Sequence, residues 1–159
     1  MKSLVEHLSQ YAAYHRDKRN IASHFVGIPL IVMAVAVLLS RPQWAGISPA
    51  VLLMVASAVF YLRLELRLGV LMTVLLGLSV WLGHTLAALS TGVWLGWGMG
   101  LFVLGWVIQF VGHYYEGRKP AFIDDVTGLI IGPLFVVVEL GFLLGWREGL
   151  QREIEARVG

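Results

Sequence analysis

The chain has 159 residues, of which 58% are hydrophobic and 14% are charged, and it contains no cysteine. So few charges cannot cover the surface of a soluble domain of this size, and the composition therefore favours a membrane protein. The lack of cysteine excludes disulfides, cysteine metal ligands and thiol nucleophiles. The formal net charge is +2, but the basic residues gather at the ends of apolar segments, as membrane topology requires. Nucleic acid is therefore not an expected partner.

Residues 1–19 have the pattern of a short amphipathic helix that lies at a membrane surface. Ser3 and Glu6 have the spacing of a capping box, in which each side chain satisfies a backbone donor at the helix start. One face then repeats at helical spacing; it consists of Leu4, Leu8, Tyr11 and His15. His7 is expected to be an ordinary surface residue. The charged residues 16–19 interrupt the pattern, and Asn20 is expected to cap the next helix.

Five apolar segments follow, at residues 21–40, 47–62, 68–90, 93–113 and 127–146. All except the second reach the roughly 20 residues that a helix needs to cross the hydrocarbon core. The expected fold is all-α: a polytopic integral membrane bundle of about five hydrophobic helices with an N-terminal amphipathic helix. Residues 1–159 are expected to form a single membrane-embedded domain. It comprises an interfacial helix at 1–19, a transmembrane bundle at 20–146 and a surface tail helix at 147–159.

The ends and faces of these segments indicate their topology and packing. Lysine and arginine are more frequent on the side of the N-terminus, and the positive-inside rule therefore places that end in the cytoplasm. Small residues recur at every fourth position in two segments, which predicts faces for close helix packing. These repeats are Gly69, Thr73 and Gly77, and Gly92, Gly96 and Gly100.

A polar group stands near the inner end of the fourth segment. Gln109, His113 and Glu116 would lie within about 60° of one another on a helix. One interpretation is an interfacial cluster, because Tyr114 and Tyr115 mark the membrane boundary at this point. The other is a functional site, since ionisable residues inside a membrane are costly and usually functional.

Three histidines are predicted to share one membrane depth: His15, His24 and His113. On an unbroken helix His15 and His24 would face opposite directions, so they converge only if the chain turns at residues 16–19. Neutral imidazoles beside a carboxylate form a set of transition-metal ligands, and several histidines with a glutamate suit a non-haem iron. The geometry alone does not choose iron over zinc.

Two further ionisable residues lie deeper in the predicted bundle. His84 and Glu139 fall at comparable depths, and they are predicted to pair with each other; the alternative is a protonated Glu139. The stretch Gly46-Ile47-Ser48 begins like the turn that carries a nucleophilic serine, but the residues after it do not complete the G-x-S-x-G pattern. A serine hydrolase is therefore not expected.

The motifs together resemble a known family. They are H-x4-N-x3-H at residues 15–24, QFVGH at 109–113, and then Glu116, Pro120-Ala121, Asp124, Gly132-Pro133 and Glu139. Over residues 11–140 this pattern resembles the 2-hydroxy fatty acid dioxygenase family. The resemblance implies an Fe(II)-dependent membrane enzyme that uses dioxygen to shorten a 2-hydroxy fatty acid by one carbon. Glu116 stands one position nearer to the histidine than in the family pattern, so it is either a ligand or a neighbour of one.

The resemblance also implies roles for particular residues. The iron ligands would be His15, His24 and His113, and the further catalytic candidates are Glu116, Gln109 and Asn20. Gln109 would orient a ligand imidazole. Arg118, Lys119 or Arg19 would hold the substrate carboxylate, although all three equally suit topology anchors.

The expected partners follow from this assignment. They are Fe2+, a 2-hydroxy fatty acid, dioxygen and membrane lipid. The assignment is also compatible with a homo-oligomer. The expected location is a bacterial inner membrane, with the N-terminus and the active site on the cytoplasmic side. The competing hypothesis is a non-enzymatic membrane scaffold or carrier, whose polar cluster only fixes the packing of helices.

Overall fold

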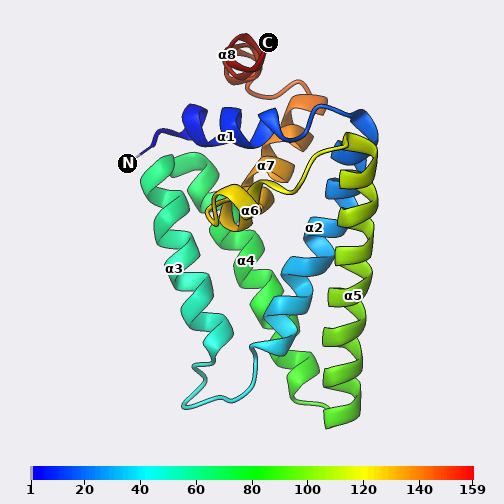
Figure 1. Ribbon diagram of the computed structural model, residues 1–159. Coiled ribbons are helices and arrows are strands. Elements are labelled where there is room, and N and C mark those ends of the chain that lie inside the picture. The colour runs from blue at the N-terminus through cyan, green and yellow to red at the C-terminus, as the bar shows by residue number, and fades with distance from the viewer. Residues whose placement is uncertain (1) are drawn as a thin grey trace. The chain divides into compact units, whose positions relative to one another are not determined.

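The computed structural model describes residues 2–159, and its regular structure is helical (Figure 1). The helices are α1 (Leu4–Ala13), α2 (Lys18–Leu38), α3 (Pro49–Leu64), α4 (Leu66–Ala87), α5 (Thr91–Glu116), α6 (Ala121–Asp124), α7 (Gly128–Leu143) and α8 (Glu148–Val158). The five predicted apolar segments correspond to α2, α3, α4, α5 and α7. The prediction of an all-α fold is therefore confirmed.

Helix length decides which of these elements can cross a membrane. Within residues 2–159, α2, α4 and α5 are long and apolar enough to do so, and α7 with α8 would raise the number to four, although that pair is bent by 116°. Helix α3 is apolar but has 16 residues, which gives about 24 Å at 1.5 Å per residue. This is less than the roughly 30 Å of a typical hydrocarbon core. The chain is thus a helical membrane protein with three to four helices of spanning length.

The chain divides into two compact units. The first comprises Met1–Ile28 and Ile108–Gly159, and the second comprises Pro29–Val107. The boundary falls inside α2 and α5, so both helices contribute to both units. Every residue predicted to act in catalysis, substrate binding or metal binding belongs to the first unit.

In the second unit, close helix packing depends on glycines at particular faces. Helices α3 and α4 lie side by side (Figure 1), and a Cβ at Gly69 would lie 2.5 Å from the Leu62 Cα atom. The predicted packing role of Gly69 is therefore confirmed. The structure does not support the same role for Gly77, Gly92, Gly96 and Gly100 within this chain, because a Cβ at any of them meets nothing within 4 Å in the described residues. Helix α2 instead approaches α5 at Gly98, on another face.

In the first unit, α1 packs between protein elements. Ser3 Oγ accepts the backbone N–H of Glu6 at 3.2 Å, which confirms the predicted helix start. Leu8 and Tyr11 are buried, and α1 contacts both α7 and α8 (Figure 1). Leu150 and Ile154 form the buried side of α8. The apolar face of α1 is therefore covered by protein.

The start of α2 differs from the prediction. The helix begins at Lys18, and Asp17 acts as its cap, because its Oδ1 accepts the backbone N–H of Arg19 at 2.8 Å. Asn20 lies inside the first turn and is fully buried. The prediction of Asn20 as the cap is wrong, because Asn20 lies inside the helix and its side chain donates to Glu116 on α5.

Candidate metal centre

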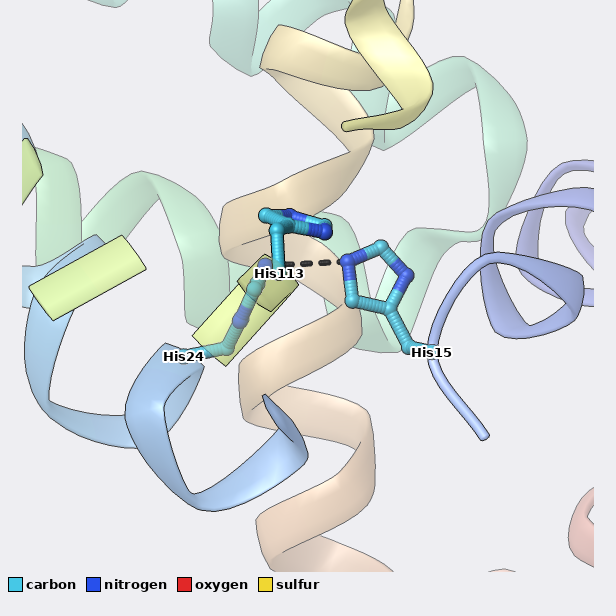
Figure 2. Close-up of side chains that lie close together, drawn as sticks. All are labelled: His15, His24 and His113. Carbon is cyan, nitrogen blue, oxygen red and sulfur yellow. Dashed lines mark hydrogen bonds between the residues drawn. The ribbon is translucent and has the colours of Figure 1, made fainter. Parts of the chain in front are cut away.

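Three histidines from three separate segments come together in the first unit. His15 lies in the turn after α1, His24 on α2 and His113 in the last turn of α5, and their rings lie close together, edge to face (Figure 2). The ring centroids are 4.4 Å apart for His15 and His24, 5.2 Å for His15 and His113, and 4.9 Å for His24 and His113. All three are buried, and one nitrogen of each lies within 4.8 Å of the others. Nitrogens bound to one ion at about 2.1 Å are roughly 3.4 Å apart, so small ring movements would allow a shared metal.

Two local features produce this arrangement. The chain turns between the end of α1 at Ala13 and the start of α2 at Lys18, as predicted, and this turn lets His15 and His24 converge. Helices α2 and α5 then meet at Gly112, where a Cβ would overlap Ser23 Oγ and lie 2.6 Å from Asn20 Oδ1. The glycine of the QFVGH motif therefore makes the close approach possible.

Backbone carbonyls determine which nitrogen of each ring carries the proton. His15 Nδ1 lies 2.7 Å from the carbonyl oxygen of Tyr11, and His24 Nδ1 lies 2.8 Å from that of Asn20. A carbonyl oxygen only accepts hydrogen bonds, so each Nδ1 must donate, and a neutral ring then has a bare lone pair on Nε2. The two Nε2 atoms are 2.9 Å apart (Figure 2). Two lone pairs at this distance repel each other unless a cation lies beside them.

A proton is an unfavourable choice for that cation. Burial lowers the pKa of His15 to about 4, because the charged imidazolium loses its hydration. At neutral pH the Nε2 atom of His15 is therefore available as a metal ligand. This chemistry of the donor set fits a transition-metal ion.

An aromatic stack fixes the plane of the His15 ring. The Tyr11 ring lies parallel to it, with centroids 4.1 Å apart and an interplanar angle of 7°. Phe135 of α7 packs against Tyr11 at 4.8 Å and against His15 at 5.6 Å. The imidazole is thus held by one hydrogen bond and by aromatic neighbours on α1 and α7.

Glu116 lies beside the histidines without belonging to their group. Its carboxylate accepts the backbone N–H of Arg16 at 2.8 Å and that of Asp17 at 2.6 Å, and Asn20 Nδ2 donates to it at 3.3 Å. Within residues 2–159, the atoms close enough to share an ion come from His15, His24 and His113 alone. The observed contacts agree with the second of the two predicted roles, in which Glu116 is a neighbour of a ligand.

Gln109 is buried one helical turn before His113. It is 5% exposed, and neither Gln109 Oε1 nor His113 Nδ1 makes a hydrogen bond in the described part of the chain. Gln109 therefore does not orient His113 through that nitrogen. Its buried amide still needs a polar partner, because an unsatisfied group of this kind is unfavourable.

Comparison with known proteins identifies the family. A family profile described as "2-hydroxy-palmitic acid dioxygenase Mpo1-like" matches residues 1–144. The chain belongs to the Mpo1-like family. It is 35% identical over 157 residues to "2-hydroxy-palmitic acid dioxygenase MPO1" of Saccharomyces cerevisiae, an alignment that covers 96% of this chain and 87% of the yeast protein. No solved structure matches the chain. The predicted family resemblance is confirmed, and the matched region of this Mpo1-like chain contains all three histidines.

The three cations predicted to hold a substrate carboxylate all have partners within the protein. Arg118 donates to the Ala13 carbonyl at 3.2 Å and lies 4.1 Å from the Tyr14 ring centroid. Lys119 forms an ion pair with Asp124 at 2.7 Å. Arg19 pairs with Asp17 at 2.9 Å and lies over the Tyr115 ring. A bound carboxylate would therefore have to share these side chains with their present partners.

The structure also has a cavity close to His15 that the sequence did not predict. It measures about 260 Å³ and is lined by α1, α6 and the start of α7, with polar walls from His7, Gln10, Tyr14, Asp124 and Thr127. Tyr11 borders both this cavity and His15. The prediction of His7 as a surface residue is wrong, since it is 7% exposed. In the sequence, the spacing of His7, Tyr11 and Tyr14 indicates that the three residues share one helical face. This pattern could have pointed to the cavity.

In the second unit His84 has a partner that its spacing did not predict. His84 Nε2 lies 2.8 Å from Ser48 Oγ, which also accepts the backbone N–H of Val51 and so caps α3. Ser48 is fully buried. The pair therefore connects the start of α3 to α4, which is a structural role, whereas the sequence suggested Glu139 as the partner.

Proposed function

We propose that this Mpo1-like chain is an Fe(II)-dependent dioxygenase that shortens 2-hydroxy fatty acids by one carbon. Homology supports a role as a 2-hydroxy fatty acid dioxygenase, because the yeast relative is named for that activity on 2-hydroxy-palmitic acid. The observation that supports the metal dependence is the 2.9 Å approach of the Nε2 atoms of His15 and His24, with His113 completing the group.

The donor set agrees with ferrous iron. It consists of three imidazoles, and the chain contains no cysteine that would favour a thiolate site. Iron bound there would supply coordination positions for dioxygen and for substrate oxygens. The protein's own part is to hold the His15 and His24 rings in the correct tautomer and to keep water from the buried site.

The proposed reaction balances with dioxygen as its oxidant. A 2-hydroxy acid, R–CH(OH)–COOH, and O2 give R–COOH, CO2 and H2O. The bond between C1 and C2 breaks, C1 leaves as carbon dioxide, and C2 is oxidised from an alcohol to the new carboxyl carbon. No separate reductant is needed.

The remaining residues suit binding of an amphipathic substrate. The acyl chain would lie among the apolar helices, while its carboxylate would be held near the aqueous end of α5 by Arg118, Lys119 or Arg19. By the positive-inside rule, the basic residues at that end support a site on the cytoplasmic side of the membrane. A bacterial inner membrane is the proposed location.

The test begins with anaerobic Fe(II) loading of the purified full-length chain. We expect near-stoichiometric iron, and oxygen consumption with 2-hydroxy-palmitic acid but not with palmitic acid, together with a product one carbon shorter. Changing His24 or His113 to Ala should abolish both iron retention and activity, whereas His84→Ala, in the second unit, should retain iron. A well-folded protein that never binds iron would favour the scaffold hypothesis instead.

A further inference from the structure

The Glu116 carboxylate closes the turn that carries His15. It accepts two successive backbone N–H groups, those of Arg16 at 2.8 Å and Asp17 at 2.6 Å. These peptide groups directly follow His15, so the carboxylate fixes the backbone at that point. They also lie at the start of α2, where the helix dipole favours a negative charge.

The same carboxylate is connected to the segment that orients His24. Asn20 Nδ2 donates to Glu116 Oε2 at 3.3 Å, and the backbone carbonyl of Asn20 accepts the Nδ1–H of His24 at 2.8 Å. Asn20 is 0% exposed, so its side chain has no access to water as an alternative partner. Glu116 therefore fixes Asn20, and the carbonyl of Asn20 keeps the His24 proton on Nδ1.

The third segment is the helix of Glu116 itself. Glu116 follows His113 by three residues on α5, a spacing that puts both side chains on one helical face. The turn after α1, the first turn of α2 and the last turn of α5 thus meet at one carboxylate.

We infer that Glu116 is a positioning residue, which assembles the three-histidine site from the turn after α1, from α2 and from α5 without binding the metal itself. This inference rests on the proposed metal site. Both oxygens of Glu116 already accept hydrogen bonds from main-chain or amide N–H groups. A glutamine at this position would present an N–H group to at least one of these donors, and the contact would be lost.

The test compares Glu116→Gln with Glu139→Gln in the full-length protein, using Co2+ as an optical probe. Glu139 is a partly buried glutamate on α7, so it controls for the loss of a carboxylate. Chelator competition gives the dissociation constant, and the visible absorption of bound Co2+ reports the ligand geometry. We expect Glu116→Gln to weaken Co2+ binding by roughly 10- to 100-fold and to alter the absorption spectrum, while Glu139→Gln changes neither.

Asn20→Ala keeps the test decisive if Glu116→Gln does not fold. It removes one of the three contacts to Glu116, and we expect a smaller loss of Co2+ affinity in the same direction. Wild-type affinity and spectrum in both variants would overturn the positioning role while leaving the metal site intact. Failure of the wild-type protein to bind either Co2+ or Fe2+ would overturn the proposed function, and this inference with it.

Discussion

The protons of His15 and His24 lie on the far sides of their rings because the carbonyl oxygens of Tyr11 and Asn20 accept them. This leaves two bare Nε2 atoms 2.9 Å apart in a buried place. Two bare lone pairs cannot form a hydrogen bond with each other, whereas a cation beside them would relieve the contact. At the scale of single residues, the local backbone thus orients the two rings as the proposed metal site requires.

Tyr11 offers a test of how firmly the His15 ring is held. Tyr11→Phe retains the ring that stacks on His15 at 4.1 Å, so we expect stability within about 0.5 kcal/mol of the wild type and normal iron content. Tyr11→Ala removes the stack and the packing against Phe135. It should lower the free energy of unfolding by about 3–5 kcal/mol and speed the release of iron. Denaturant unfolding in detergent and iron release to a chelator measure both effects.

Equal iron release from the two variants would contradict this expectation. It would mean that the hydrogen bond from His15 to the Tyr11 carbonyl, which both variants retain, orients the ring by itself.

At the scale of helices, the site depends on how closely α2 and α5 approach. The contact at Gly112 brings the first turns of α2 against the last turns of α5, where His24 and His113 reside. Because a helix is stiff, separating the two backbones at this point would move both imidazoles. The absence of a Cβ at position 112 therefore permits the close approach of His24 and His113.

Gly112→Ala should separate these helices, and Gly100→Ala on the same helix is its matched control. The added Cβ at position 112 overlaps Ser23 Oγ, whereas a Cβ at position 100 meets nothing within 4 Å in the described residues. We expect Gly112→Ala to cost about 1–3 kcal/mol of stability and to reduce iron binding. Gly100→Ala should be neutral, or stabilising by up to about 1 kcal/mol. Thermal unfolding and iron content of both variants check this; a neutral Gly112→Ala would contradict the close contact.

At the scale of the whole chain, the sequence predicted what depends on local pattern. Apolar runs predicted the helices, and the charged residues 16–19 predicted the turn that lets His15 and His24 converge. The sequence did not reveal that Glu116 contacts Arg16 and Asp17, because these residues lie about a hundred positions away. It also did not predict which glycines face a neighbouring helix, since spacing shows that a face exists but not what covers it.

The contact between His24 and His113 also constrains membrane topology. Both residues must lie on one side of the membrane, so the chain between them crosses an even number of times. Helices α2, α4 and α5 are of spanning length, and three crossings are odd. We therefore expect α3 to cross as well, despite its 16 residues, with the bilayer thinning slightly around it.

Single cysteines can test this topology, because the natural chain contains none. We expect a membrane-impermeant maleimide to label Glu6→Cys and Arg67→Cys from one side of the membrane, and Gln43→Cys and Ser90→Cys from the other. All four positions are exposed, so each should react when its side is accessible. If positions 67 and 90 were labelled from the same side as position 43, neither α3 nor α4 would cross the membrane. The number of crossings between His24 and His113 would still be even, so the two residues could still meet. If position 67 were labelled from the same side as position 43 but position 90 were not, the number of crossings would be odd. The three histidines could then not form one site.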